Sequence, residues 1–193
     1  MTKNKKAARP QAKAKKKTCE EIFCAGFGGQ GIMFMGKLLA QAGLAAGKYV
    51  TWMPSYGAEV RGGAAYSMVK ISDKEIASPL VANPTILIAM NKPSLVKYEG
   101  KLNEGAMLFA NTSLIDDIQK IKGITTIKVP MTGIASRLGN TKFTNMVAIG
   151  AMLKKSKVIS MRNVVNALKE AFANNEKLFA LNKEALQKGY KAV

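Results

Sequence analysis

The sequence predicts an α/β protein with a three-layer, Rossmann-like fold, a mainly parallel sheet and helices at the C-terminal end. From residue 20 onward, short β-rich apolar runs alternate with helical patterns. Several of these runs are continuously apolar, which is typical of strands covered by helices on both faces. The first run passes through a glycine-rich loop directly into an apolar helical pattern. With 48% hydrophobic residues, the chain can form one core.

Six segments have strand character, and the helical patterns fall between and after them. The expected strands are residues 20–25, 49–53, 65–71, 86–90, 107–110 and 126–129. The segment 65–71 follows a Gly-Gly turn, so we expect it to be an antiparallel member of the sheet.

The expected helices cover residues 32–46, 94–98, 132–138, 144–153, 161–172 and 178–186. Gly47 and Gly139 are placed to end the first and third of them, since glycine adopts the left-handed backbone that often follows a helix. Ser94 and Thr132 are the expected N-caps of two short helices. The last two helices have apolar residues at 3–4-residue spacing, as in helices packed against a core.

The charge of the chain is concentrated at its N-terminus. The formal net charge is +18, and residues 1–17 contain eight lysines and arginines and no acid. We therefore expect residues 1–18 to form a disordered basic tail and residues 19–193 to form the domain. The tail is predicted to be a solvated extension. It could bind nucleic acid, but no aromatic residue lies among its lysines to stack on bases, which argues against that function.

Several function classes are excluded by composition. The chain has no histidine, which removes the commonest general base and every histidine-based metal site or catalytic triad. Cys19 and Cys24 are its only cysteines, too few for an iron–sulfur cluster with its roughly four thiolates. We expect them to be reduced thiols of a cytoplasmic protein. No signal peptide or membrane span is expected, and we predict neither a catalytic residue nor a metal site in this chain.

The loop after the first strand is the first candidate site. Gly26, Gly28 and Gly31 match the pattern G-x-G-x-x-G, with Gly29 and Gln30 between them. Such a loop could bind a dinucleotide, since backbone N–H groups at a helix N-terminus bind phosphate. It could equally allow close packing of strand and helix, or hold an anion shared with a partner subunit.

The residues after the second strand argue against a dinucleotide. A Rossmann site needs an acidic residue about 20 positions beyond the glycines to bind the ribose hydroxyls. The second strand ends in Met53 and Pro54, and the next acid is Glu59. A stand-alone dinucleotide-binding oxidoreductase therefore stays an alternative, but the sequence lacks the acidic residue that would bind the ribose.

A second polar loop follows the second strand. It comprises Ser55, Tyr56, Gly57, Glu59, Arg61, Gly62 and Gly63. In a parallel sheet this loop and the glycine loop leave the same carboxyl edge, where ligands bind. A surface turn held by a Glu59–Arg61 pair is the simpler interpretation, but such a pair contributes about 1 kcal/mol or less. We therefore expect the two loops to form a site or an interface.

Four segments in order carry a family resemblance: AGFGGQGI, TWMPSYGAEVRGG, SPLVANPTILIAMNKPS and TNMVAIGAML. Together they resemble the gamma subunit of 2-oxoacid:ferredoxin (acceptor) oxidoreductases, the pyruvate/ketoisovalerate oxidoreductase gamma domain family. The resemblance runs from about Glu20 to the C-terminal helices. Ala58 and Val60 depart from it, since the family usually has proline at the first position and methionine or alanine at the second.

The resemblance implies a subunit that is inactive alone. The family oxidatively decarboxylates a 2-oxoacid to an acyl-CoA with thiamine diphosphate, and electrons pass through iron–sulfur clusters to ferredoxin. This sequence has no thiamine diphosphate and Mg²⁺ motif, so alpha and beta subunits would hold these groups, often with a delta subunit. Coenzyme A is the cosubstrate.

Within such a complex, Gly28, Gly29, Gln30 and Gly31 would shape the first loop. Tyr56, Glu59 and Arg61 would make polar contacts at a substrate or coenzyme A entrance, and Arg61 could bind a carboxylate or phosphate with two hydrogen bonds. The form TWMPSYG favours 2-oxoglutarate or a branched-chain 2-oxoacid over pyruvate.

Overall fold

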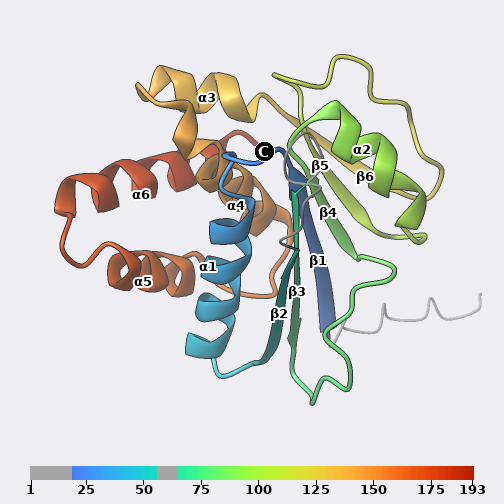
Figure 1. The fold of residues 1–193 in the computed structure, drawn as a ribbon, viewed down its shortest axis with the longest axis horizontal. Coiled ribbons are helices and arrows are strands. Elements are labelled where there is room, and N and C mark those ends of the chain that lie inside the picture. Colours follow the sequence, from blue (N-terminus) through green and yellow to red (C-terminus); the bar gives the residue numbers. More distant parts are fainter. Residues whose placement is uncertain (1–18, 56–64) are drawn as a thin grey trace, which may run out of the picture.

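A single mixed sheet organises the chain (Figure 1). The structure, a computed structural model, describes residues 19–55 and 65–193. Within these residues the sheet has six strands in the order β2-β3-β1-β4-β5-β6. The strands are β1 (Cys19–Gly26), β2 (Tyr49–Ser55), β3 (Ala65–Ser72), β4 (Ile86–Ala89), β5 (Met107–Asn111) and β6 (Thr125–Val129). All six predicted strands are confirmed; the basic tail predicted for residues 1–18 lies outside the described residues.

The strand directions confirm a mainly parallel sheet. Strand β3 pairs antiparallel with both β1 and β2, as predicted for the segment 65–71. The pairs β1–β4, β4–β5 and β5–β6 are parallel. Strands β1 and β2 therefore run in the same direction, with β3 between them. This order differs from the usual Rossmann arrangement, in which the first two strands are neighbours.

Helices cover both faces of the sheet, which gives the three predicted layers (Figure 1). The helices are α1 (Ile32–Ala45), α2 (Lys92–Tyr98), α3 (Met131–Arg137), α4 (Thr144–Lys155), α5 (Met161–Ala171) and α6 (Glu176–Lys191). Alternate residues of β1 separate the two cores: Ile22 and Cys24 face α1 and α4, whereas Phe23 and Ala25 face α2. No helix among the described residues is long and apolar enough to span a membrane.

Two predicted N-caps are wrong. Asn91, not Ser94, caps α2: its Oδ1 accepts a hydrogen bond of 2.9 Å from the Ser94 N–H, and Ser94 is buried within the helix. The N-cap position of α3 is Pro130, and Thr132 lies in its first turn. A Ser or Thr before an apolar pattern predicts a cap only when it is the first residue outside the helix. Both predicted helix ends are confirmed, since Gly47 and Gly139 adopt φ angles of 70° and 89° just after α1 and α3.

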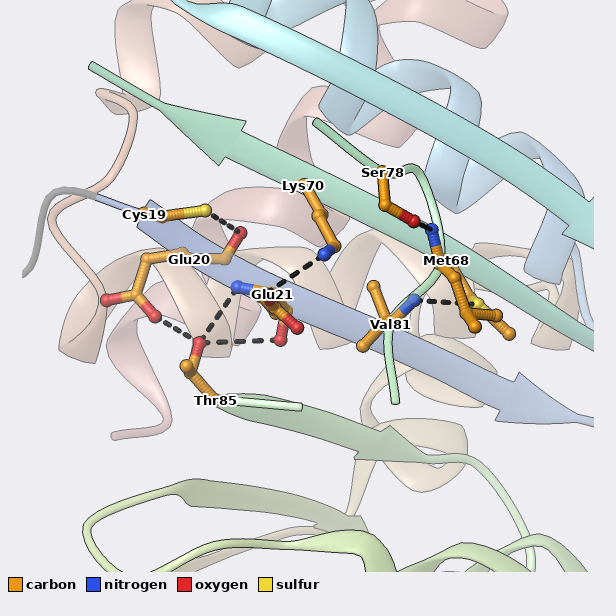
Figure 2. Close-up of polar contacts among 9 residues, drawn as sticks. Cys19, Glu20, Glu21, Met68, Lys70, Ser78, Val81 and Thr85 are labelled. Carbon is orange, nitrogen blue, oxygen red and sulfur yellow. Dashed lines mark hydrogen bonds and ion pairs between the residues drawn. The ribbon is translucent and has the colours of Figure 1, made fainter. Parts of the chain in front are cut away.

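Polar contacts join β1 to β3 and to the residue before β4, near the amino-terminal end of β1 (Figure 2). Lys70 Nζ of β3 lies 3.1 Å from Glu21 Oε1 of β1, and these residues are direct cross-strand partners. The Thr85 hydroxyl, just before β4, donates to the Glu20 carboxylate and accepts a 3.0 Å hydrogen bond from the Glu21 N–H. These contacts set the register of β1 against both neighbours.

Candidate functional site

The two predicted loops start from neighbouring positions at the carboxyl edge of the sheet. Gly26, the last residue of β1, pairs with Ala65 of β3, and Ser55, the last residue of β2, pairs with Tyr66. The first residues of β3 thus lie between the two strand ends. Both loops leave the same edge, as predicted. Six residues of the second candidate loop lie outside the described residues: Tyr56, Gly57, Glu59, Arg61, Gly62 and Gly63.

The glycine loop is a tight turn that leads directly into α1. The Gln30 N–H donates to the Phe27 carbonyl at 3.2 Å, which closes the turn. Gly29 and Gly31 have φ angles of 87° and 73°, in the region that favours glycine. Gly31 is the N-cap residue of α1, and its first turn has no acidic side chain and no side-chain cap. The N-terminal end of this helix therefore offers backbone N–H groups toward the loop.

Neighbouring side chains take up the space beside two of the three fingerprint glycines. A Cβ atom on Gly26 would lie 2.5 Å from Gln30 Oε1 and 2.9 Å from Met90 Cβ. A Cβ atom on Gly31 would lie 2.3 Å from Asn145 Nδ2 of α4. These glycines are thus required by packing inside the chain. Close packing of strand and helix, one of the interpretations of the motif, accounts for Gly26, where a Cβ would lie 2.8 Å from Ile32 Cδ1 of α1, whereas Gly31 packs against α4.

Three buried amides support this edge, and the sequence analysis identified none of them. Asn91 follows β4, Asn111 ends β5 and Asn145 lies in the first turn of α4. All three are at most 5% exposed. Asn91 and Asn145 do lie within two of the four family-like segments. A local signal exists for Asn91, which precedes Lys92 and Pro93, since a proline in the first helical turn after an asparagine is typical of a helix start.

Asn111 uses its whole side chain to join the ends of β4, β5 and β6. Its Nδ2 donates to the Met90 carbonyl at 3.0 Å and to Thr132 Oγ1 at 2.9 Å. Its Oδ1 accepts from the N–H groups of Ser113 and Thr132 at 3.3 and 3.2 Å. A buried amide with all of these groups satisfied is rigid, so this part of the edge is a fixed support.

A hollow of about 340 Å³ opens between the glycine loop and the start of β3. Its described lining consists of Phe27, Gly28, Gly29, Gly31, Ile32, Met33, Phe34, Ser55 and Ala65. Three of the four predicted loop glycines, Gly28, Gly29 and Gly31, thus line this hollow together with Ser55, whereas Gly26 does not. Phe27 is 42% exposed at its rim. The described lining has no charged side chain, so its polar groups are backbone amides and the Ser55 hydroxyl.

The same edge does not fit a nicotinamide or flavin dinucleotide. In a Rossmann site the acidic residue ends the strand beside β1. Here β3 occupies that position and runs in the opposite direction, and β2 ends in Met53, Pro54 and Ser55 without an acid. The described part of this edge therefore lacks both the parallel strand beside β1 and the acidic residue at its end that would bind the ribose.

Both thiols are in surroundings that disfavour the reactive thiolate form. Burial raises the pKa of the Cys24 thiol to about 12 and also raises the pKa of Cys19. Neither cysteine is in a disulfide. Among the described residues, no three His, Cys, Asp or Glu side chains are grouped as metal ligands.

Comparison with known proteins agrees with the fold. A family model described as pyruvate ferredoxin/flavodoxin oxidoreductase matches residues 21–192. The chain belongs to this family. The matched residues include the two candidate loops, the three buried amides, five whole strands and all of β1 except Cys19 and Glu20. The resemblance noted from four sequence motifs is confirmed.

Two curated relatives come from Methanothermobacter marburgensis. The chain is 35% identical to its 2-oxoglutarate synthase subunit KorC, covering 89% of this chain and 99% of KorC. It is 34% identical to the ketoisovalerate oxidoreductase subunit VorA over 86% of this chain. The chain spans only about a third of VorA, 34% of its length.

Two solved structures have the same fold. One is the gamma subunit of a keto/oxoacid ferredoxin oxidoreductase from Geobacter sulfurreducens, with 30% identity, a TM-score of 0.79 and coverage of 90% of this chain and 97% of that chain. The other is a 2-oxoglutarate:ferredoxin oxidoreductase from Magnetococcus marinus with 2-oxoglutarate, coenzyme A and succinyl-CoA bound. It has 26% identity and a TM-score of 0.84, and the match covers 92% of this chain and 31% of that chain.

Proposed function

We propose that this chain is the gamma subunit of a multi-subunit 2-oxoacid:ferredoxin oxidoreductase. The complex would convert a 2-oxoacid and coenzyme A to an acyl-CoA, carbon dioxide and one proton, with two electrons passing to ferredoxin. The observation that carries the proposal is the match to KorC over nearly the whole of both chains, within the family match of residues 21–192.

The chain's own residues support a role that depends on partner subunits. An iron–sulfur cluster takes about four thiolates, whereas this chain has two cysteines, one of them buried with a strongly raised pKa. It has no histidine and no thiamine diphosphate motif. Thiamine diphosphate, Mg²⁺ and the clusters would therefore belong to alpha and beta subunits, with a possible fourth, delta subunit, and the assembly would be cytoplasmic.

The names of the relatives support a proposal for the substrate class. KorC and VorA are named for 2-oxoglutarate and ketoisovalerate, and the Magnetococcus enzyme contains 2-oxoglutarate and coenzyme A. These names agree with the preference drawn from the TWMPSYG segment. We propose 2-oxoglutarate or a branched-chain 2-oxoacid as the substrate, with pyruvate as the third choice.

The carboxyl edge of the sheet would form part of the substrate or coenzyme A entrance. The hollow beside Gly28, Gly29 and Ser55 offers backbone N–H groups at the start of α1, which suit an oxygen-bearing group. Arg61 and Tyr56 follow Ser55 in the sequence and would add a guanidinium and a phenol. In this arrangement the subunit helps to bind and orient the substrate or coenzyme A, and its partner subunits supply the groups that break bonds.

Reconstitution tests the proposal. The thiamine- and cluster-bearing subunits are assayed with and without this chain for coenzyme A-dependent reduction of methyl viologen. We expect the chain to restore or strongly raise the rate with 2-oxoglutarate or 2-oxoisovalerate, and to be inactive alone. Parallel assays with pyruvate rank the substrates. An equal rate with and without the chain would overturn the proposal.

A further inference from the structure

The orientation of the Gln30 side-chain amide is determined by a backbone donor. Gln30 Oε1 accepts a hydrogen bond of 2.7 Å from the Phe27 N–H. Only the oxygen of the amide can accept from this N–H, so the Gln30 NH₂ group, on the other branch of the planar amide, points away from the Phe27 N–H. Gly26 makes room for this arrangement, since a Cβ there would lie 2.5 Å from the same oxygen.

Asn91 fixes the same amide from the opposite direction. Its Oδ1 accepts from the Ser94 N–H at 2.9 Å as the cap of α2. Its Nδ2 therefore faces Gln30 and donates to Gln30 Oε1 at 3.2 Å. Asn91 is 1% exposed. The donor and acceptor directions of these hydrogen bonds, from the start of α2 to the glycine loop, are therefore set by buried groups.

We propose that Asn91 is a positioning residue that holds Gln30 with its NH₂ group directed to a bound substrate. Gln30 is partly exposed, and no described residue accepts a hydrogen bond from its Nε2. The NH₂ is thus a donor for an acceptor oxygen: the carboxylate of the 2-oxoacid, or a phosphate or amide carbonyl of coenzyme A. This inference rests on the proposed function and adds to it a specific group and the residue that orients it.

The substitution Asn91→Asp separates orientation from capping. Aspartate still places an oxygen at the Ser94 N–H, so the cap of α2 is retained. Its second oxygen cannot donate to Gln30 Oε1 and instead attracts the Gln30 NH₂. We expect the amide to turn over, at the expense of its hydrogen bond from the Phe27 N–H, so that its donor is used inside the protein. Gln30→Met removes the donor, and with it the oxygen that accepts from the Phe27 N–H and Asn91 Nδ2, with little change in side-chain length. It is the second variant.

In the reconstituted complex, we expect Asn91→Asp and Gln30→Met each to raise the Michaelis constant of one substrate by about tenfold, the value of one lost hydrogen bond. The Michaelis constant of the other substrate should not change, which tells whether the 2-oxoacid or coenzyme A meets Gln30. The double variant should show no further increase, because both changes remove the same donor. Unchanged Michaelis constants in Asn91→Asp would overturn the inference.

Side-chain amide exchange in the ¹⁵N-labelled chain provides a readout that needs no activity. The Gln30 NH₂ protons should exchange rapidly in the wild type and become protected in Asn91→Asp. Equal exchange in the two proteins would overturn the orientation. If the wild-type chain fails to restore activity, the proposed function fails and the substrate contact with it, while the exchange experiment still decides how Gln30 is held.

Discussion

Asn145 Nδ2 lies 3.4 Å from the carbonyl oxygen of Gly31, although 114 positions separate the two residues in the chain. This contact joins α4 to the end of the glycine loop. It also closes the space beside the Gly31 Cα, where a Cβ would lie 2.3 Å from the same nitrogen. The loop thus depends on a distant helix for its shape.

Gly31→Ala should therefore destabilise the protein through two effects. The φ angle of 73° costs alanine about 1–2 kcal/mol, and displacement of Asn145 adds about 1–3 kcal/mol. Gly29→Ala is the matched control, since Gly29 has a φ angle of 87° but no atom within 4 Å of its Cβ position. Urea denaturation should show the larger loss for Gly31→Ala. Equal losses of unfolding free energy in the two variants would mean that Asn145 moves aside at no free-energy cost.

Ser67→Ala should lower stability by about 1 kcal/mol, because it removes the acceptor of a hydrogen bond from the Trp52 indole. The Trp52 Nε1–H donates to the buried Ser67 hydroxyl at 2.8 Å. Trp52 is the single tryptophan of the chain, so its emission maximum reports this contact directly. Ser136→Ala, at an exposed position of α3, makes the same chemical change and should leave emission unchanged. Identical spectra for all three proteins would contradict the prediction.

The buried Cys24 thiol should make the protein less stable in alkaline solution. Its folded pKa, about 12, lies above the ordinary value of 9.0. The full stability is therefore present below pH 9, and it falls as the unfolded thiol ionises while the folded one stays protonated. The loss should reach up to about 1.4 kcal/mol per pH unit between about pH 9 and 12.

Denaturant unfolding at about pH 8 and about pH 10 measures this slope for the wild type and for Cys24→Ala. The substitution also leaves a small cavity, but that cost is the same at both pH values and cancels in the difference. Parallel slopes in the two proteins would show that other groups cause the alkaline loss.

The strands could be predicted because their signal is local. Continuous apolar runs such as those of β4 and β5 are buried on both faces, and short buried strands are the only elements of that length and composition that fit between helical patterns. Gly47 and Gly139 ended their helices as predicted, since a left-handed residue after a helix is a property of that position alone.

The caps of the short helices were wrong for a related reason. The cap of α2 is decided by which side chain reaches the Ser94 N–H, and Asn91 does so. The Thr132 hydroxyl instead accepts a hydrogen bond from Asn111, the last residue of strand β5. A local pattern cannot distinguish a hydroxyl that caps its own helix from one that a distant partner has taken.

The sequence by itself determined the α/β class, the six strands and the glycine loop, because each of these depends on residues close together in the chain. It also determined the family, because each of the four segments that carry the resemblance is a short continuous pattern. Only the tertiary structure decided that β3 separates β1 from β2, since strand order depends on pairing between distant segments. It also decided what the loop glycines are for. Gln30 and Asn145 occupy the space beside Gly26 and Gly31, and this requires α2 and α4 to be packed in place.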